Sequence, residues 1–257
     1  MKNNRNIGKI LVVYLVALFL LKIDSLLLGD SPRLSIKGIA CYLVPVFVAG
    51  IFYCIEKRKN TIPCKQDKVD FGNIKGSIYI VIAGGIFCAL SISQLGKEEL
   101  ANFQLDICIY LLCTCVMTGI FEEVVFRGLI QNMICEIGGY KGKQEAKYIF
   151  IASIIFGMTH ILNLIEKPYF VLGTFTQIIY TFCVGVLLGA TYWKTRSLLL
   201  VIVLHSFFNF LGQFPVVFEI AGQGQAVQED INIISMVIQL VVMFPCVIFG
   251  KKMLKAS

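Results

Sequence analysis

Four titratable residues in apolar surroundings are the strongest candidates for chemistry in this chain. Glu122 and Glu123 follow an apolar run, and Arg127 comes one helical turn later. His160 and His205 are the two histidines of the chain, and each lies inside another apolar run. Ionisable side chains are costly in hydrocarbon, so a membrane protein keeps them mainly where they face its interior and act there. We therefore expect the function at these residues.

Helical spacing predicts different roles for the two glutamates. Glu123 and Arg127 are four residues apart, so they share a helix face and are expected to form an ion pair. Two readings of this pair carry equal weight: a purely structural ion pair, or a catalytic role for Glu123. Glu122 is rotated by about 100° from that face and is the freer carboxylate, so it is the better candidate for a general base. His205 and Asn209 share a face by the same spacing.

These residue types suit hydrolysis of an amide bond. A carboxylate can take a proton from water and later deliver it to a leaving amine. Histidine can orient the water or donate to an oxyanion, and the Asn209 amide can donate as well. Alternatively, Glu122, His160 and His205 could hold zinc and leave a fourth position open. Taken singly, each histidine or Asn209 could instead be a buried structural residue.

The composition indicates that membrane helices position these residues. Of the 257 residues, 57% are hydrophobic and only 15% are charged, whereas about a quarter are charged in a soluble domain. At about 20 residues per span, the length allows about eight transmembrane helices. We predict an all-α polytopic membrane protein with a single domain over residues 1–257. The spans are expected at 9–28, 38–55, 76–94, 104–130, 148–165, 170–193, 197–214 and 231–250.

The basic residues predict an orientation in the membrane. They gather in the N-terminal tail, in every second loop and at the C-terminus, so both termini of this multi-pass cell-membrane protein are expected to be cytoplasmic. This alternation also argues against nucleic acid as the partner that explains the net charge of +7. Counted from the cytoplasmic span ends, Glu122, His160 and His205 lie about 12–18 Å deep. We expect them to line one cavity that opens to the cytosol.

A pair of glycines in the sixth predicted span bears on helix packing. Gly185 and Gly189 form a GxxxG motif, which permits two helices to approach closely. We interpret it as a packing feature.

Three motifs resemble those of the CPBP family, the CAAX protease and bacteriocin-processing group, which includes the type II CAAX prenyl endopeptidases. They occur in the family's order, inside predicted spans, and cover about residues 104–215, the expected catalytic core. In this sequence the motifs are Glu122, Glu123 and Arg127 (EExxxR), Phe156 and His160 (FxxxH), and His205 followed four residues later by Asn209.

The resemblance implies an eight-helix core around a conical cavity open to the cytosol, and an intramembrane endopeptidase. It implies that Glu122 with His160 activates water and that His205 with Asn209 forms an oxyanion hole. Metal dependence has been proposed for the family, so zinc is a possible cofactor, although a metal-independent glutamate mechanism is favoured. Some members of the family are scaffolds or regulators without catalytic activity.

The expected function is therefore cleavage of a membrane-associated peptide or protein within the lipid bilayer. The Ile, Lys and Asn content is typical of a low-GC bacterium, for which the resemblance points to peptide maturation, leader removal or bacteriocin self-immunity. One alternative is a non-catalytic membrane regulator or immunity protein that binds a membrane partner. Another is a proton- or metal-coupled transporter that uses the same side chains. The sequence predicts no oligomeric state.

Overall fold

Every regular element in the described part of the chain is a helix. The computed structural model describes residues 2–22, 36–58, 71–138, 144–218 and 233–255. The elements are α1 (Lys2–Leu21), α3 (Ile36–Arg58), η1 (Phe71–Ile78), α4 (Tyr79–Ile92), α5 (Lys97–Leu100), α6 (Leu105–Glu123), η2 (Val124–Gln131), α7 (Asn132–Ile137), α8 (Glu145–Met158), η3 (Thr159–Leu162), α9 (Asn163–Glu166), α10 (Val171–Thr195), α11 (Leu198–Gln213), η4 (Phe214–Phe218) and α12 (Ile233–Lys255).

Among the described residues, six helical segments are long and apolar enough to cross a membrane. A further apolar helix, Asn6–Leu21, is shorter. The prediction of an all-α polytopic membrane protein is confirmed. Helix occurs at all eight predicted spans, although residues 23–28 of the first lie outside the described residues. The six segments are Lys75–Ile92, Leu105–Ile137, Glu145–Glu166, Val171–Thr195, Leu198–Phe218 and Ile233–Lys255.

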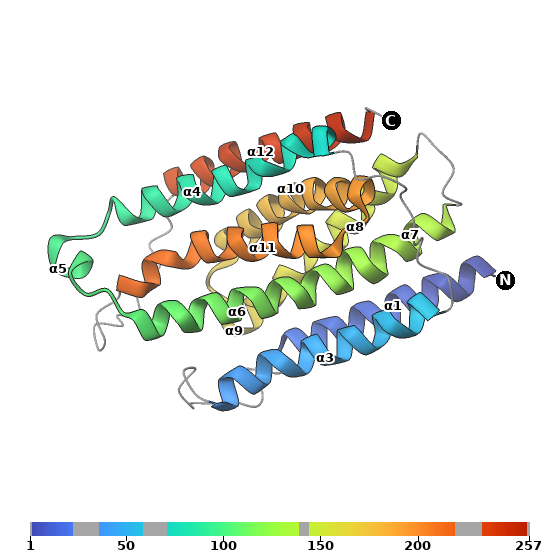
Figure 1. Ribbon diagram of the computed structural model, residues 1–257, viewed down its shortest axis with the longest axis horizontal. Coiled ribbons are helices and arrows are strands. Elements are labelled where there is room, and N and C mark those ends of the chain that lie inside the picture. The colour runs from blue at the N-terminus through green and yellow to red at the C-terminus, as the bar shows by residue number, and fades with distance from the viewer. Residues whose placement is uncertain (1, 23–35, 59–70, 139–143, 219–232, 256–257) are drawn as a thin grey trace.

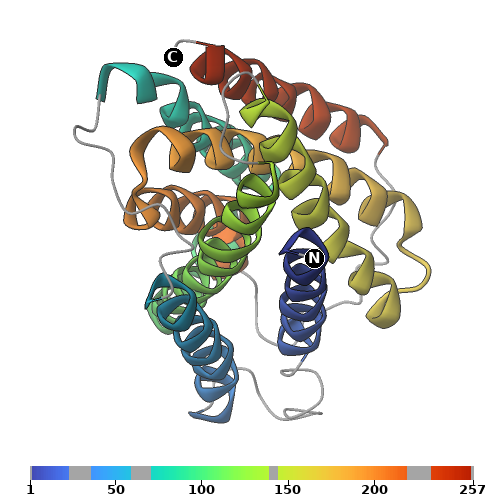
Figure 2. The same ribbon diagram turned by 90° about the vertical axis from the view of Figure 1, so that its right-hand side faces the viewer.

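The long helices run along a common direction (Figures 1 and 2). We call one end of the bundle the terminal end; there α1 begins, and α3, α7, α10 and α12 end (Figure 1). We call the opposite end, where α4 and α11 end and where α10 and α12 begin, the cavity end. Helix α10 packs mainly against α8 and α12, whereas α11 packs mainly against α6 and α4.

Glycines allow α8 to lie directly against α10. A Cβ atom on Gly185 would lie 3.1 Å from the Cβ of Ser153, and one on Gly157 would lie 2.8 Å from the Ile178 carbonyl oxygen. A Cβ atom on Gly189 would lie 2.8 Å from the Gln131 side-chain oxygen. The GxxxG motif therefore makes room for α8 and also for polar side chains from η2, which the packing interpretation had not included.

The fourth predicted span was too short. It was expected to end at residue 130, but the helix continues through η2 and α7 to Ile137. Segment η2 is a π-helix of eight residues, and π-helical turns inside α-helices are frequently found at functional sites. Its eight residues are all buried. The π-helix begins immediately after Glu123 and includes Arg127, so it sets the direction of the side chains that follow the glutamate pair.

Candidate active site

Glu123 lies at the centre of a buried polar network. Its side chain is 0% exposed, and its Oε1 atom lies 2.9 Å from Nη1 of Arg127. The same oxygen lies 2.7 Å from Nδ1 of His205, which comes from α11. The ion pair expected from the four-residue spacing is thus present, and it has His205 as an additional member. Glu123 holds His205 in place from the side away from solvent.

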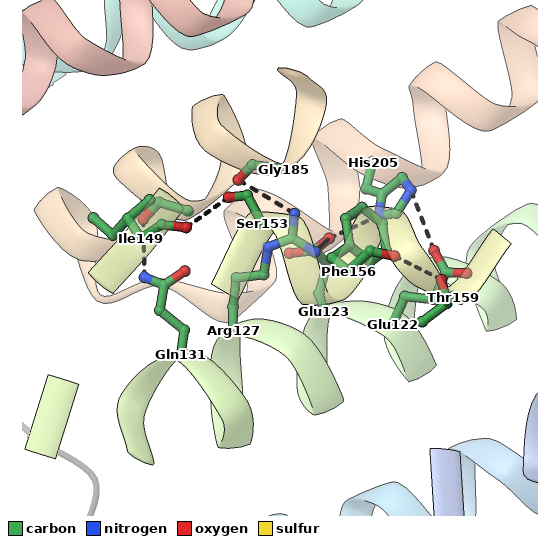
Figure 3. A network of polar contacts seen from close by, with 11 residues as sticks. Glu122, Glu123, Arg127, Gln131, Ile149, Ser153, Phe156, Thr159, Gly185 and His205 are labelled. Carbon is green, nitrogen blue, oxygen red and sulfur yellow. Dashed lines mark hydrogen bonds and ion pairs between the residues drawn. The ribbon is translucent and has the colours of Figure 1, made fainter. Parts of the chain in front are cut away.

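Arg127 continues this network toward α10. Its Nη2 atom donates to the Gly185 carbonyl at 3.5 Å, and its guanidinium carbon lies 4.4 Å from the Phe156 ring centroid. One turn further, Gln131 Nε2 donates to the Gly189 carbonyl at 3.1 Å. Figure 3 shows both side chains pointing from one helix toward the next. The backbone of the GxxxG motif is therefore a pair of acceptors for side chains of η2.

Glu122 faces the other side of His205. Its Oε2 atom lies 3.5 Å from Nε2 of His205, so the imidazole stands between the two carboxylates (Figure 3). Glu122 is 7% exposed and lines a cavity, which Glu123 does not. The two adjacent glutamates are thus unequal, as the helical spacing predicted. Glu123 is enclosed by Arg127 and His205, whereas Glu122 borders a space where a substrate can enter.

The cavity has a volume of about 480 Å³ and lies between α4, α6, α8, α10, α11 and α12. Four of the predicted site residues border it, namely Glu122, His160, His205 and Asn209. They come from three segments that are well separated in the sequence. The shared cavity that was expected from the similar depth of Glu122, His160 and His205 is therefore present.

Phe156 orients the histidines by packing. Its ring centroid lies 6.2 Å from that of His160 and 5.8 Å from that of His205, with interplanar angles of 68° and 87°. Edge-to-face geometry of this kind is favourable for aromatic rings. The residue is 1% exposed and also lies under the Arg127 guanidinium. The FxxxH motif thus has a physical basis, because one phenylalanine contacts both histidines and the arginine.

The direction of the cavity differs from the prediction. It was expected to open on the side where the chain termini lie. Its outer wall is instead formed by the last turn of α4, the last turn of α11 and the first turns of α12, all at the cavity end. The cause is the longer fourth helix, since Glu122 lies fifteen residues from Ile137 rather than eight from a span end. His160 is likewise closer to Glu166 than to Glu145.

The proposed zinc site is not supported by the arrangement. Within the described ranges, no group of three or more His, Cys, Asp or Glu side chains is placed to hold a metal ion. Glu122, His160 and His205 border the same cavity, but they do not form a ligand set.

Several residues of the site were missed by the motif reasoning. Glutamines from three helices and from the turn after α4 line the cavity, and Gln131 donates to the Gly189 carbonyl behind it. Amide side chains inside apolar helices are the signal that could have identified them, because they need hydrogen-bond partners in a membrane. The four cavity glutamines are Gln94, Gln177, Gln213 and Gln239.

The comparison with protein families agrees with this geometry. Residues 104–211 match the family model described as type II CAAX prenyl endopeptidase Rce1-like. The matched segment runs from the start of α6 into α11 and contains all three motifs. No curated protein and no solved structure matches the chain. This match over residues 104–211 supports membership of the CPBP family of CAAX-type membrane proteases.

Proposed function

We propose that this protein is an intramembrane endopeptidase that hydrolyses a peptide bond with a water activated by Glu122. The observation that supports the proposal is the position of Glu122 on the cavity wall, 3.5 Å from His205 Nε2. Glu122 and His205 both lie within the segment that matches the protease family. The substrate would be a membrane-associated peptide or protein, and the protein would act in the cell membrane.

A charge count relates the proton states of Glu122 and His205. Glu123 and Arg127 neutralise each other, and Nδ1 of His205 donates to Glu123. The cluster is then neutral overall in two states: a Glu122 carboxylate beside a His205 cation, or a protonated Glu122 beside a neutral His205. Buried clusters with uncompensated charge are strongly disfavoured. The state in which Glu122 can act as a base is therefore also the state in which His205 Nε2 carries a proton to donate.

The reaction follows from this state. Glu122 accepts a proton from water while the water oxygen bonds to the carbonyl carbon of the substrate. His205 Nε2 and the Asn209 amide donate to the oxygen on which negative charge develops, and such preorganised donors are usually the largest catalytic contribution. The C–N bond then breaks, and the proton held by Glu122 passes to the leaving nitrogen. His160 borders the same space and orients the water.

Glu123 has a positioning role in this proposal. It is fully enclosed and touches His205 and Arg127 rather than the cavity. Its carboxylate sets the tautomer of His205 by accepting from Nδ1.

The biological role of the protein would be maturation of a secreted peptide or self-immunity to a bacteriocin. The cleaved bond would then belong to the secreted peptide or to the bacteriocin.

The test compares membranes containing the wild-type protein with membranes containing Glu122→Gln. New peptide termini are identified by mass spectrometry, and a synthetic peptide across the identified bond is then cleaved by purified protein in liposomes. Loss of a general base lowers the rate by about 10²–10⁴-fold, and we expect a loss of this size. Glu98→Gln, an exposed carboxylate at the cavity end, is the matched control and should cleave normally. Equal cleavage by Glu122→Gln and wild type would exclude Glu122 as the base.

A variant that retains its biological effect without cleavage would support the non-catalytic alternative. The same strains answer this question, provided that membrane levels of the variants are equal. If Glu122→Gln and His160→Ala both keep the phenotype, the protein acts by binding and the endopeptidase proposal fails.

A further inference from the structure

We propose that Gln177 and Tyr180 of α10 bind the substrate carbonyl next to the one that is attacked, and that Asn163 sets the orientation of Gln177. The inference rests on the proposed function, because the bound segment is the one that would be cleaved beside Glu122. It adds a second set of hydrogen-bond donors and a positioning residue, all of them outside the three motifs.

Two polar side chains on one face of α10 border the cavity. Gln177 and Tyr180 are three residues apart, so they are neighbours on the helix surface, and both line the cavity that Glu122 lines. Thr176, in contrast, donates its hydroxyl to the Leu172 carbonyl of the same helix. A threonine is thus satisfied within its own helix, whereas a glutamine amide and a phenol need partners from elsewhere.

Asn163 is the partner of Gln177 on the neighbouring segment. Its Nδ2 atom donates to Oε1 of Gln177 at 2.9 Å. A glutamine amide carries its acceptor oxygen and its donor nitrogen on different corners, so this bond turns Nε2 of Gln177 away from Asn163. Asn163 begins α9, immediately after η3, which carries His160. One short segment therefore places His160 at the cavity and also fixes the amide on α10.

Tyr180 connects this amide to the reaction site. Its hydroxyl group interacts with the Gln177 side chain and with Glu122. The contacts thus run from Asn163 through Gln177 and Tyr180 to the neighbourhood of Glu122. Because Oε1 of Gln177 is turned toward Asn163, α10 presents the N–H groups of Gln177 and the O–H group of Tyr180 to the cavity. These groups are hydrogen-bond donors, and they suit a carbonyl oxygen.

The donors on α10 and those on α11 border the cavity from opposite sides. Helix α11 packs mainly against α6 and α4, whereas α10 packs mainly against α8 and α12, and both groups of helices line the cavity. His205 and Asn209 are the donors of the first group, and Gln177 and Tyr180 are those of the second. A peptide in the cavity therefore meets donors on two sides.

An extended peptide backbone matches this arrangement. The carbonyl groups of successive residues in an extended chain point to opposite sides. When the carbonyl that is attacked points to His205 and Asn209, the carbonyl of an adjacent residue points to Gln177 and Tyr180. The second contact keeps the backbone extended and holds the reacting carbon beside Glu122. We infer that this part of the recognition depends on the backbone of the substrate and not on its side chains.

The binding role is tested in a Glu122→Gln background, so that binding is measured without turnover. The probe is the fluorescein-labelled synthetic peptide across the bond identified by mass spectrometry, and its Kd is measured by fluorescence anisotropy in detergent micelles. We expect Gln177→Leu and Tyr180→Phe each to weaken binding about 2–10-fold, the factor for one hydrogen bond. Gln144→Leu and Tyr169→Phe, at exposed positions outside the cavity, are matched controls and should bind normally. Normal binding by Gln177→Leu, or an equal loss in the controls, would overturn the proposal.

Asn163→Asp separates positioning from packing. The new side chain has nearly the same shape and still bonds to Gln177, but a carboxylate accepts where the asparagine amide donates. The Gln177 amide then turns over and presents Oε1 to the cavity. We expect Asn163→Asp to weaken binding as much as Gln177→Leu does, with no further loss in the double variant. Normal binding by Asn163→Asp would refute the positioning role, because a merely structural contact is retained.

The carbonyl is tested from the peptide side. Two versions of the probe carry a thioamide, a weaker acceptor, at one or the other carbonyl next to the attacked one. We expect one of them to bind several-fold more weakly than the all-amide peptide to Glu122→Gln, and this difference to vanish in Glu122→Gln/Gln177→Leu. The same difference in both proteins would refute the contact. If Glu122→Gln cleaves the peptide like the wild type, the proposed function fails; if cleavage requires Glu122 but Gln177→Leu binds normally, only the α10 contacts are refuted.

Discussion

Replacement of Arg127 tests whether the buried network has the energetic role that its geometry implies. Arg127→Met keeps the apolar stem but leaves the Glu123 carboxylate without its cation, and both side chains are at most 2% exposed. Removing one partner of a buried ion pair costs about 3–5 kcal/mol. The lost cation–π contact with Phe156 adds about 1 kcal/mol. The 3.5 Å bond to Gly185 is long and adds little. We expect a loss of about 4–6 kcal/mol in the free energy of unfolding.

The double variant Glu123→Gln/Arg127→Met separates pairing from packing. It buries no charge, and the glutamine oxygen can still accept from His205 Nδ1. Because replacing both members of a buried pair is often nearly neutral, its cost should be about 2 kcal/mol or less. The coupling energy is the difference between the cost of the double variant and the summed costs of the two single variants. It should then reach about 3 kcal/mol.

The assay is reversible unfolding in mixed detergent micelles, followed by fluorescence of Trp193, the only tryptophan of the chain. Lys252→Met, an exposed lysine on α12, controls for loss of a positive charge. Exposed ion pairs contribute at most about 1 kcal/mol to the free energy of unfolding. A loss smaller than this for Arg127→Met would therefore refute the assignment of a buried ion pair. The assignment would also be refuted if the double variant lost as much unfolding free energy as the two single variants lose together.

Three further outcomes are expected from the same contacts. Gly189→Ala should lower the free energy of unfolding by about 1–3 kcal/mol, because the added Cβ would press on Gln131 and Ile149. Gly85 has open space around it, so Gly85→Ala should be neutral or stabilising in the same unfolding assay. Lys22→Met breaks the ion pair with the half-exposed Glu166 and should change the unfolding free energy by no more than about 1 kcal/mol. A metal chelator should leave cleavage of the identified peptide unchanged, because no group of three or more His, Cys, Asp or Glu side chains among the described residues is placed to hold a metal ion; a loss of activity restored by zinc would contradict this.

The positions of the helices and the main members of the site could be predicted from the sequence for physical reasons. Apolar runs of about 20 residues have few alternatives to membrane helices, and the Glu123–Arg127 contact follows from spacing within one helix. The convergence of Glu122 with His160 and His205 could be expected because each would otherwise be isolated in hydrocarbon. The contact of His205 with Glu123 joins two helices, so spacing within one helix could not predict it.

The opening of the cavity could not be obtained from the same pattern. Depth was counted from predicted span ends, and the apolar pattern weakens after Arg127, where Gln131 and Asn132 are polar but buried. Their partners are carbonyls and a hydroxyl, none of which is visible in a hydropathy pattern. Seven residues of helix were therefore assigned to a loop, which displaces the apparent depth of Glu122 by about 10 Å.

The buried side chains Arg127, Gln131 and Asn132, which follow Glu122 along its helix, also have an electrical consequence. They belong to the fifteen residues of helix between Glu122 and Ile137, roughly 22 Å, across which part of the membrane voltage falls. Moving one elementary charge through 100 mV involves about 2.3 kcal/mol. Arg127 and Glu123 are oppositely charged and lie 2.9 Å apart, so their displacement as a pair does almost no work against this field. The buried Arg127 can therefore lie in the field of the membrane without acting as a voltage sensor.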